Sequence, residues 1–88
     1  MGWRIEIHRT AEQQISKLDP QTQLQVIQYL RERIEGGSDP RRVGKALRGE
    51  KRGLWRYRVH DYRLICDIRD AEHTVAVLTV AHRKDAYR

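Results

Sequence analysis

Arginine side chains are the groups in this 88-residue chain that are best suited to chemistry. Fourteen of its eighteen basic residues are arginine, and the formal net charge is +6. Residues 41–63 hold nine basic side chains against two acidic ones. Because the guanidinium group is a planar fork, it binds phosphate through two hydrogen bonds and stacks on bases. The pattern predicts a polyanion-binding surface; the alternative is a solubilising surface, which usually mixes both signs.

Two of these arginines belong to an alternating stretch, residues 55–59, that predicts a strand with Arg56 and Arg58 on one side. A two-residue turn at His60–Asp61 then sets a register in which Arg58 directly faces Arg63. Directly opposed residues share a side of the sheet, so the hairpin has an apolar side and a cationic side. The expected core side carries Trp55, Tyr57, Val59, Tyr62, Leu64, Cys66 and Ile68, and the cationic side carries Arg56, Arg58, Arg63, Ile65 and Asp67.

The predicted opposition of Arg58 and Arg63 serves no purpose in folding. Like charges directly opposite each other across a ladder cost roughly 0.2–1 kcal/mol. A bound phosphate would turn this repulsion into a clamp. Two alternatives stay open: an acid such as Asp67 relieves the pair, or a longer turn shifts the register.

The C-terminal end of the chain can add cations to the same surface. A mostly apolar strand over Thr74–Ala81 is followed directly by His82, Arg83 and Lys84, and then by Tyr87. Since adjacent side chains of a strand point to opposite faces, only one of His82 and Arg83 can join the arginines. We expect Arg83 on the cationic side and His82 near the core side or the sheet end.

Other kinds of site have little support in the sequence. Cys66, the single cysteine, falls on the core side of the hairpin, so we expect an inert buried thiol rather than a nucleophile. No Cys/His cluster suggests a metal. No apolar run is long enough to span a membrane, and the N-terminus lacks the pattern of a signal peptide. We therefore expect a cytoplasmic protein without a cofactor.

Periodicity predicts one strand and two helices ahead of the basic stretch. Trp3–His8 alternates apolar and polar residues, as a half-buried strand does. Thr10 and Gln13 have the spacing of a capping box for a short helix that ends near Leu18. Asp19–Pro20 suits the start of a second helix. The predicted apolar face of this second helix consists of Leu24, Ile27, Leu30 and Ile34, and its end of Gly36–Gly37.

A basic loop over Ser38–Gly53, anchored by Val43 and Leu47, leads into the last strands. These are expected at Leu54–Val59, Tyr62–Ile68 and Thr74–Ala81. The predicted fold class is α+β: an N-terminal strand, a helical hairpin, then a three-strand antiparallel meander, with the helices packed on one face of the sheet. Residues 1–88 form a single domain, in which the place of the N-terminal strand stays open.

Four motifs, in this order, resemble the RelE-type toxins of the RelE/ParE superfamily. They are residues 45–49, the alternating 55–59, residues 61–64 after the turn, and residues 81–84 with Tyr87. The resemblance covers nearly the whole chain. It implies the toxin of a type II toxin–antitoxin system, which enters the ribosomal A site and cuts mRNA by attack of a 2′-OH on the phosphate. It also implies a cognate antitoxin that wraps the toxin, contacts with 16S rRNA, no metal, and DNA contact only through the antitoxin.

The resemblance also assigns roles by position. Arg56 and Arg58 match the family's basic strand pair and would hold the RNA backbone. Arg63 and Arg83 would stabilise the developing negative charge, and Tyr87 would donate a proton to the leaving oxygen or stack on a base. The further residues expected to bind RNA are Lys45, Arg48, Lys51, Arg52 and Lys84.

The chain departs from the family in the strand pair, which is often lysine there. Arginine effectively cannot lose its proton in a protein and cannot act as a general base. His60 and His82 are the nearby imidazoles, so the identity of the base stays open. Two other functions also stay open: a ParE-like toxin that inhibits DNA gyrase without a nuclease site, and an RNA-binding module without catalysis.

Overall fold

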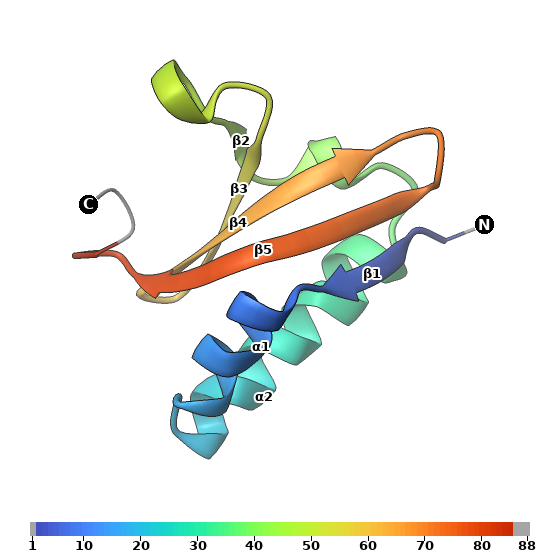
Figure 1. Cartoon of the computed structure of the whole chain (residues 1–88). Helices are drawn as coiled ribbons and strands as arrows, with labels where there is room; N and C mark the ends of the chain where they lie inside the picture. The colour runs from blue at the N-terminus through green and yellow to red at the C-terminus, as the bar shows by residue number, and fades with distance from the viewer. Residues whose placement is uncertain (1, 86–88) are drawn as a thin grey trace.

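The computed structural model describes residues 2–85, which form a five-stranded mixed sheet with two helices on one face (Figure 1). In chain order the elements are β1 (Arg4–Ile7), α1 (Arg9–Ser16), α2 (Pro20–Tyr29), a π-helical turn (Leu30–Glu35), a 3-10 turn (Pro40–Arg42), β2 (Lys45–Ala46), a second 3-10 turn (Gly49–Lys51), β3 (Trp55–Val59), β4 (Tyr62–Arg69) and β5 (Thr74–His82). The strand order is β1-β5-β4-β3-β2, with β1 parallel to β5 and the other neighbours antiparallel. The predicted α+β class is confirmed.

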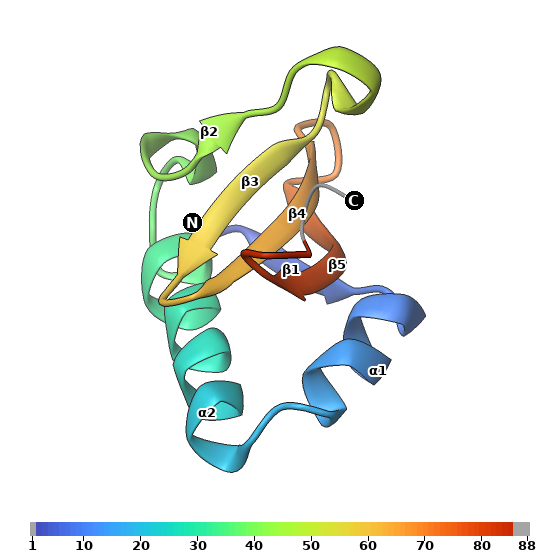
Figure 2. The ribbon, with the colours of Figure 1, turned by 90° about the vertical axis from the view of Figure 1, so that its left-hand side faces the viewer.

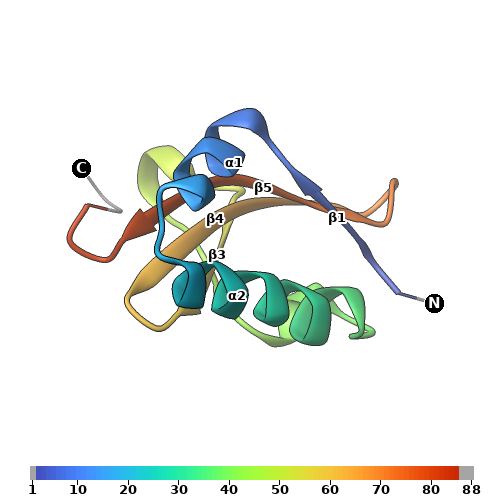
Figure 3. The ribbon, with the colours of Figure 1, turned by 90° about the horizontal axis from the view of Figure 1, so that it is seen from below.

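The helices cover the side of the sheet that carries the apolar residues of the β3–β4 hairpin. Seen from below, α1 and α2 cross the same face, with α1 against β5 and α2 towards β3 (Figure 3). Tyr57, Leu64 and Cys66, all expected on the core side, are fully buried. They pack with Trp3, Ala11, Ile15, Val26, Leu30, Ile34, Val59, Val75, Val77 and Val80. No described helix has the length and apolar character needed to cross a membrane.

The apolar face of α2 differs from the expected one at its first two positions, Leu24 and Ile27, neither of which belongs to the buried core. Leu24 was expected in the core, but its side chain is 62% exposed. The buried stripe instead runs through Val26, Leu30 and Ile34, which are spaced by four residues and so lie one above another on a helix. Leu24 lies two positions before Val26, nearly on the opposite side of the helix.

One of the two predicted helix starts is confirmed and the other is wrong. Asp19 caps α2, accepting a hydrogen bond from the Thr22 N–H, and Pro20 is the first helical residue. Thr10 does not cap α1, which begins at Arg9 after a cap residue without a side-chain hydrogen bond, His8. The His8 N–H still donates to the sheet, at the carbonyl of Val77 (2.9 Å), and its own carbonyl accepts from the Glu12 N–H (2.8 Å), so α1 begins directly after the last sheet bond.

The basic loop is more ordered than the sequence suggested, because aromatic donors hold it to the sheet. The Trp55 Nε1–H donates to the Val43 carbonyl (2.8 Å) and the Tyr57 hydroxyl to the Pro40 carbonyl (2.7 Å). Within the loop, β2 pairs with β3 and adds a fifth strand that was not predicted. Two residues are too short for a recognisable alternation.

An exposed ion pair ties the start of this loop to the β4–β5 turn. Arg41 donates to both carboxylate oxygens of Asp70, at 2.8 and 2.9 Å. The hydrogen bonds from Arg41 lower the pKa of Asp70, so the pair stabilises the fold fully above the usual pKa of aspartate, about 4. That contribution is lost as the pH falls through the lowered pKa of the folded state.

Replacing Asp70 with asparagine should therefore lower thermal stability slightly at neutral pH, since exposed pairs contribute little. The deficit against wild type should vanish in acid, as melting curves recorded from neutral to low pH would show. Arg41→Gln on top of Asp70→Asn should add no further loss. A deficit that persists at the lowest pH would mean that Asp70 acts through something other than its charge.

Candidate phosphate-binding site

Arg58 and Arg63 directly oppose each other across the β3–β4 ladder, in the register predicted from the sequence. Among the described residues, neither guanidinium forms an ion pair with a carboxylate. The Nε of Arg63 is buried and has no hydrogen-bond partner within residues 2–85. Asp67, the acid that could have relieved the pair, is bound to Arg69 at 3.2 Å instead. The register is therefore not shifted, and no acid within residues 2–85 relieves the pair.

A second pair of like charges lies beside the first. β2 places Lys45 directly opposite Arg56 on β3, so these two cations share the face of the sheet that carries Arg58 and Arg63. We call these four residues the cationic face. Lys45 was expected to bind RNA from a loop, and the edge strand brings it to the strand arginines. The sequence signal that could have revealed this is Gly44, which allows the close approach of β2 to β3.

A β-bulge in β5 sets which C-terminal side chain joins the cationic face. The ladder between β4 and β5 shifts after Ile65, so that Leu78 is an extra residue in β5. Because of this extra residue, Ala81 faces Arg63 and His82 faces Tyr62. The ring of His82 meets that of Tyr62 edge-on, with centroids 5.4 Å apart, on the core side as expected.

Arg83 extends the ladder by one step past the end of β5. Its N–H donates to the Asp61 carbonyl (2.7 Å), and its Nε lies 3.9 Å from an Asp61 carboxylate oxygen. This bond holds Arg83 at the hairpin turn, at the same end of the sheet as Arg58 and Arg63. Side chains two residues apart on a strand point to the same face, so Arg83 lies on the face of Ala81, which is the cationic face.

The remaining predicted residues are not gathered at the cationic face. Figure 2 shows the second 3-10 turn beyond the start of β3, away from α2. Arg48, Lys51 and Arg52 are exposed on and around this turn, and Lys84 is exposed after β5. Tyr87 lies outside the described residues. The structure thus separates a compact cluster on the sheet from a cationic loop tip.

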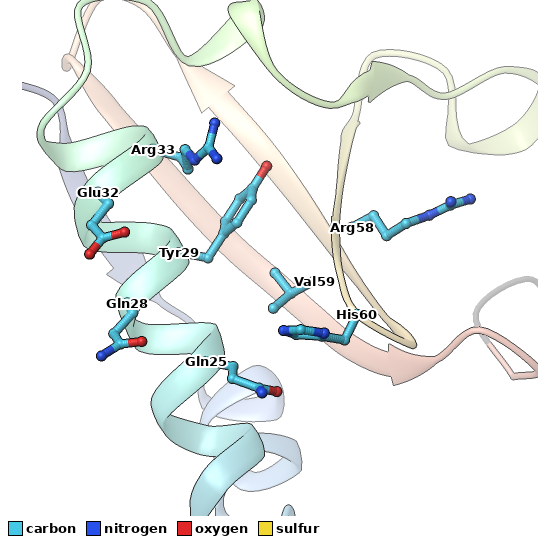
Figure 4. A pocket seen from close by; sticks show the side chains of 8 residues that line it. All are labelled: Gln25, Gln28, Tyr29, Glu32, Arg33, Arg58, Val59 and His60. Atoms are coloured by element: carbon cyan, nitrogen blue, oxygen red, sulfur yellow. The ribbon is translucent and has the colours of Figure 1, made fainter.

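Neither histidine considered as a general base lies on the cationic face. The ring of His60 points towards α2, into a groove that Tyr29, Gln25 and Arg58 also line, while the Arg58 guanidinium extends away from α2 (Figure 4). His82 faces the core side. The cluster can therefore bind and neutralise phosphate, but within residues 2–85 no imidazole is aimed at the same place. Nor do those residues contain a cluster of three metal-binding side chains.

Cys66 is fully buried, as expected for an inert thiol. Burial raises the pKa of the thiol, and the charge of Asp67 acts in the same direction. We expect no reaction of the native protein with a thiol reagent such as dithionitrobenzoate, because the thiolate is the reactive form. Denaturant should release one equivalent of product. Rapid modification of the folded protein would show that the hairpin opens locally.

Comparison with known proteins places the chain among small bacterial and archaeal toxins. A model of the ParE toxin of the type II toxin–antitoxin system parDE matches residues 5–87. The toxin RelG of Mycobacterium tuberculosis is 35% identical over 88 residues, which are 100% of this chain and 99% of that protein. The toxin RelE of the same organism is 39% identical over 51 residues, 58% of this chain and 53% of its own.

Solved structures of toxin–antitoxin complexes have the same fold. The toxin–antitoxin complex RelBE2 of Mycobacterium tuberculosis contains a chain with a TM-score of 0.82 and 33% identity, covering 97% of this chain and 95% of that one. A chain of the archaeal RelE–RelB complex of Pyrococcus horikoshii has a TM-score of 0.73 and 22% identity, covering 98% and 100%. At 22% identity the second likeness concerns the fold alone.

Proposed function

The chain belongs to the RelE/ParE superfamily of type II toxins, and we propose that it is a ribosome-dependent endoribonuclease that cuts mRNA in the A site. The opposed Arg58–Arg63 pair, which no carboxylate within residues 2–85 compensates, carries this proposal. The matching family model bears the name ParE, whereas the named relatives are RelG and RelE. We give the relatives more weight, because RelG aligns with the whole chain at 35% identity.

In the proposed reaction the bonds form and break within the RNA, so the main task of the protein is to neutralise charge. The 2′-oxygen of the RNA attacks the adjacent phosphorus, the bond to the 5′-oxygen breaks, and a 2′,3′-cyclic phosphate remains. One proton leaves the 2′-OH and another reaches the 5′-oxygen. Arg63 and Arg83 would stabilise the charge of the pentacovalent phosphorane, while Arg56 and Arg58 would hold the backbone in line. Tyr87 is our candidate for protonating the 5′-oxygen.

The cationic face offers no general base for deprotonating the 2′-OH. The two histidines point elsewhere, and arginine remains charged. We propose that the ribosome and the RNA supply this base and the in-line geometry, which would account for the proposed dependence on the ribosome. Lys45, Arg48, Lys51, Arg52 and Lys84 would contact RNA, including 16S rRNA.

A cognate antitoxin is the proposed protein partner, since the similar solved structures include toxin–antitoxin complexes. It would neutralise the toxin in the cytoplasm. Any contact with DNA would then pass through the antitoxin.

Primer extension on programmed ribosomes tests the function directly. Wild type should give a cut within the A-site codon, and Arg83→Ala should reduce its rate by about a hundredfold, as expected for removal of a charge-stabilising group. Arg31→Ala, an exposed arginine on the helical side of the molecule, is the matched control and should cut normally. No cut with wild type, together with inhibition of DNA gyrase supercoiling, would establish the ParE-like alternative instead.

A further inference from the structure

His82 makes contacts at the last residue of β5 that the proposed reaction does not use. Its ring packs edge-on against Tyr62, and its Nδ1 accepts a hydrogen bond from the Lys84 N–H (3.3 Å). Its carbonyl accepts a second bond from the Asp85 N–H (2.8 Å). One residue therefore ends the sheet and holds both ends of the turn that follows.

The side-chain bond reproduces the geometry of an Asx turn. In such a turn an asparagine or aspartate oxygen accepts the N–H two residues further on. The Nδ1 of histidine occupies the same position along the side chain as the Oδ1 of asparagine. It can accept only in the tautomer that carries its proton on Nε2. His82 thus imposes a turn on the segment that begins with Arg83.

Arg83 lies between these two anchors. On one side its N–H is bound to the Asp61 carbonyl, and on the other Lys84 is bound to the His82 ring. The bulge at Leu78 is what brings the imidazole to the Tyr62 side. Without the extra residue, alternation would place His82 on the cationic face and Arg83 over the core.

We propose that His82 is a positioning residue for Arg83: its Nδ1 holds the turn that keeps the Arg83 guanidinium at the cationic face. The inference rests on the proposed function for its effect on cleavage, although the anchor itself can be measured without ribosomes. The acceptor atom is the essential part of the imidazole, and the aromatic ring contributes stability only.

Three substitutions separate these two parts of the side chain. His82→Asn keeps an acceptor in place of Nδ1 but removes the ring, His82→Phe keeps a ring against Tyr62 but removes the acceptor, and His82→Ala removes both. We expect His82→Asn to cut ribosome-bound mRNA within about threefold of wild type. His82→Phe and His82→Ala should lose about tenfold in kcat, the value of one hydrogen bond, at unchanged KM for the ribosome.

The thermal stabilities of His82→Asn and His82→Phe should rank in the reverse order of their cleavage rates. His82→Phe should melt close to wild type because the packing on Tyr62 is kept. His82→Asn should melt at a lower temperature and yet remain active. A residue that is merely structural would make activity and stability fall together, so this crossed pattern is specific to positioning. If His82→Phe cuts as fast as wild type, or His82→Asn as slowly as His82→Ala, the proposal is wrong.

Hydrogen exchange of the Lys84 amide, measured by NMR on the free protein, tests the anchor independently of cleavage. The amide should be protected in wild type and His82→Asn, and should exchange faster in His82→Phe and His82→Ala. Equal exchange in all four proteins would overturn the anchor. If wild type does not cut mRNA, the proposed function fails, and the exchange series still decides whether Nδ1 holds the turn.

Discussion

Replacing Arg63 with methionine should reduce A-site cleavage by about 10²–10³-fold and at the same time stabilise the fold by about 1 kcal/mol. Activity is lost because the guanidinium that would meet the phosphorane charge is removed. Stability rises because two folding costs disappear: repulsion from Arg58 across the ladder, and a buried Nε that has no hydrogen-bond partner in the part of the chain that the structure describes. The methionine side chain ends at the position of the arginine Nε and has no group that needs a hydrogen bond.

The measurements are primer extension on programmed ribosomes and urea unfolding of the free toxin. Arg69→Met is the matched control on the same strand, because Arg69 is already paired with Asp67 and Glu6. That variant should cut mRNA normally and be slightly less stable. Arg63→Met and Arg69→Met should therefore move stability in opposite directions.

A double-mutant cycle shows whether the gain comes from the opposed pair. Arg58→Met alone should also stabilise the protein, but it should add little in the presence of Arg63→Met, since the repulsion is then already gone. If the stability gains of Arg58→Met and Arg63→Met add up, the destabilisation does not come from the repulsion between these two arginines. A loss of stability in Arg63→Met would mean that the guanidinium contributes to folding, and it would remove the observation on which the proposed function rests.

The hairpin register could be predicted because two local features agree. A two-residue turn at His60–Asp61 is consistent with one alternation that buries Tyr57, Leu64 and Cys66 together. A shift by one residue would have exposed all three. The opposed arginines follow directly from this register, so the centre of the candidate site could be derived from the sequence.

Features that depend on distant parts of the chain could not be derived in this way. β1 pairs with β5, the last of the described elements, and no local pattern encodes that contact. The bulge at Leu78 cannot be recognised in the sequence, because β5 is apolar on both faces and its alternation of polar and apolar residues is weak. Leu24 was misplaced because several phases of apolar residues are possible on α2, and packing selects the one through Val26.

Gly44→Ala should be the most damaging single-methyl change to the site, costing about 3 kcal/mol or more. Gly44 has a φ of +79°, which is unfavourable for any residue with a Cβ. An added Cβ would also lie 2.6 Å from Trp55 Nε1 and 2.9 Å from Tyr57 Cδ1, and would contact the Arg56 carbonyl. These groups belong to β3, so β2 would be forced off the sheet edge.

Gly49→Ala is a closely matched control for this prediction. Its φ is +70°, but a Cβ there would meet no atom within 4 Å, so only the backbone strain of about 1–2 kcal/mol applies. The difference between the two variants in urea unfolding measures the steric contact alone. In ribosome assays Gly44→Ala should also bind more weakly, because Lys45 leaves Arg56, whereas Gly49→Ala should keep the cationic face intact. Equal costs in the two variants would mean that β2 yields to the methyl group, and that Lys45 is not held tightly beside the arginines.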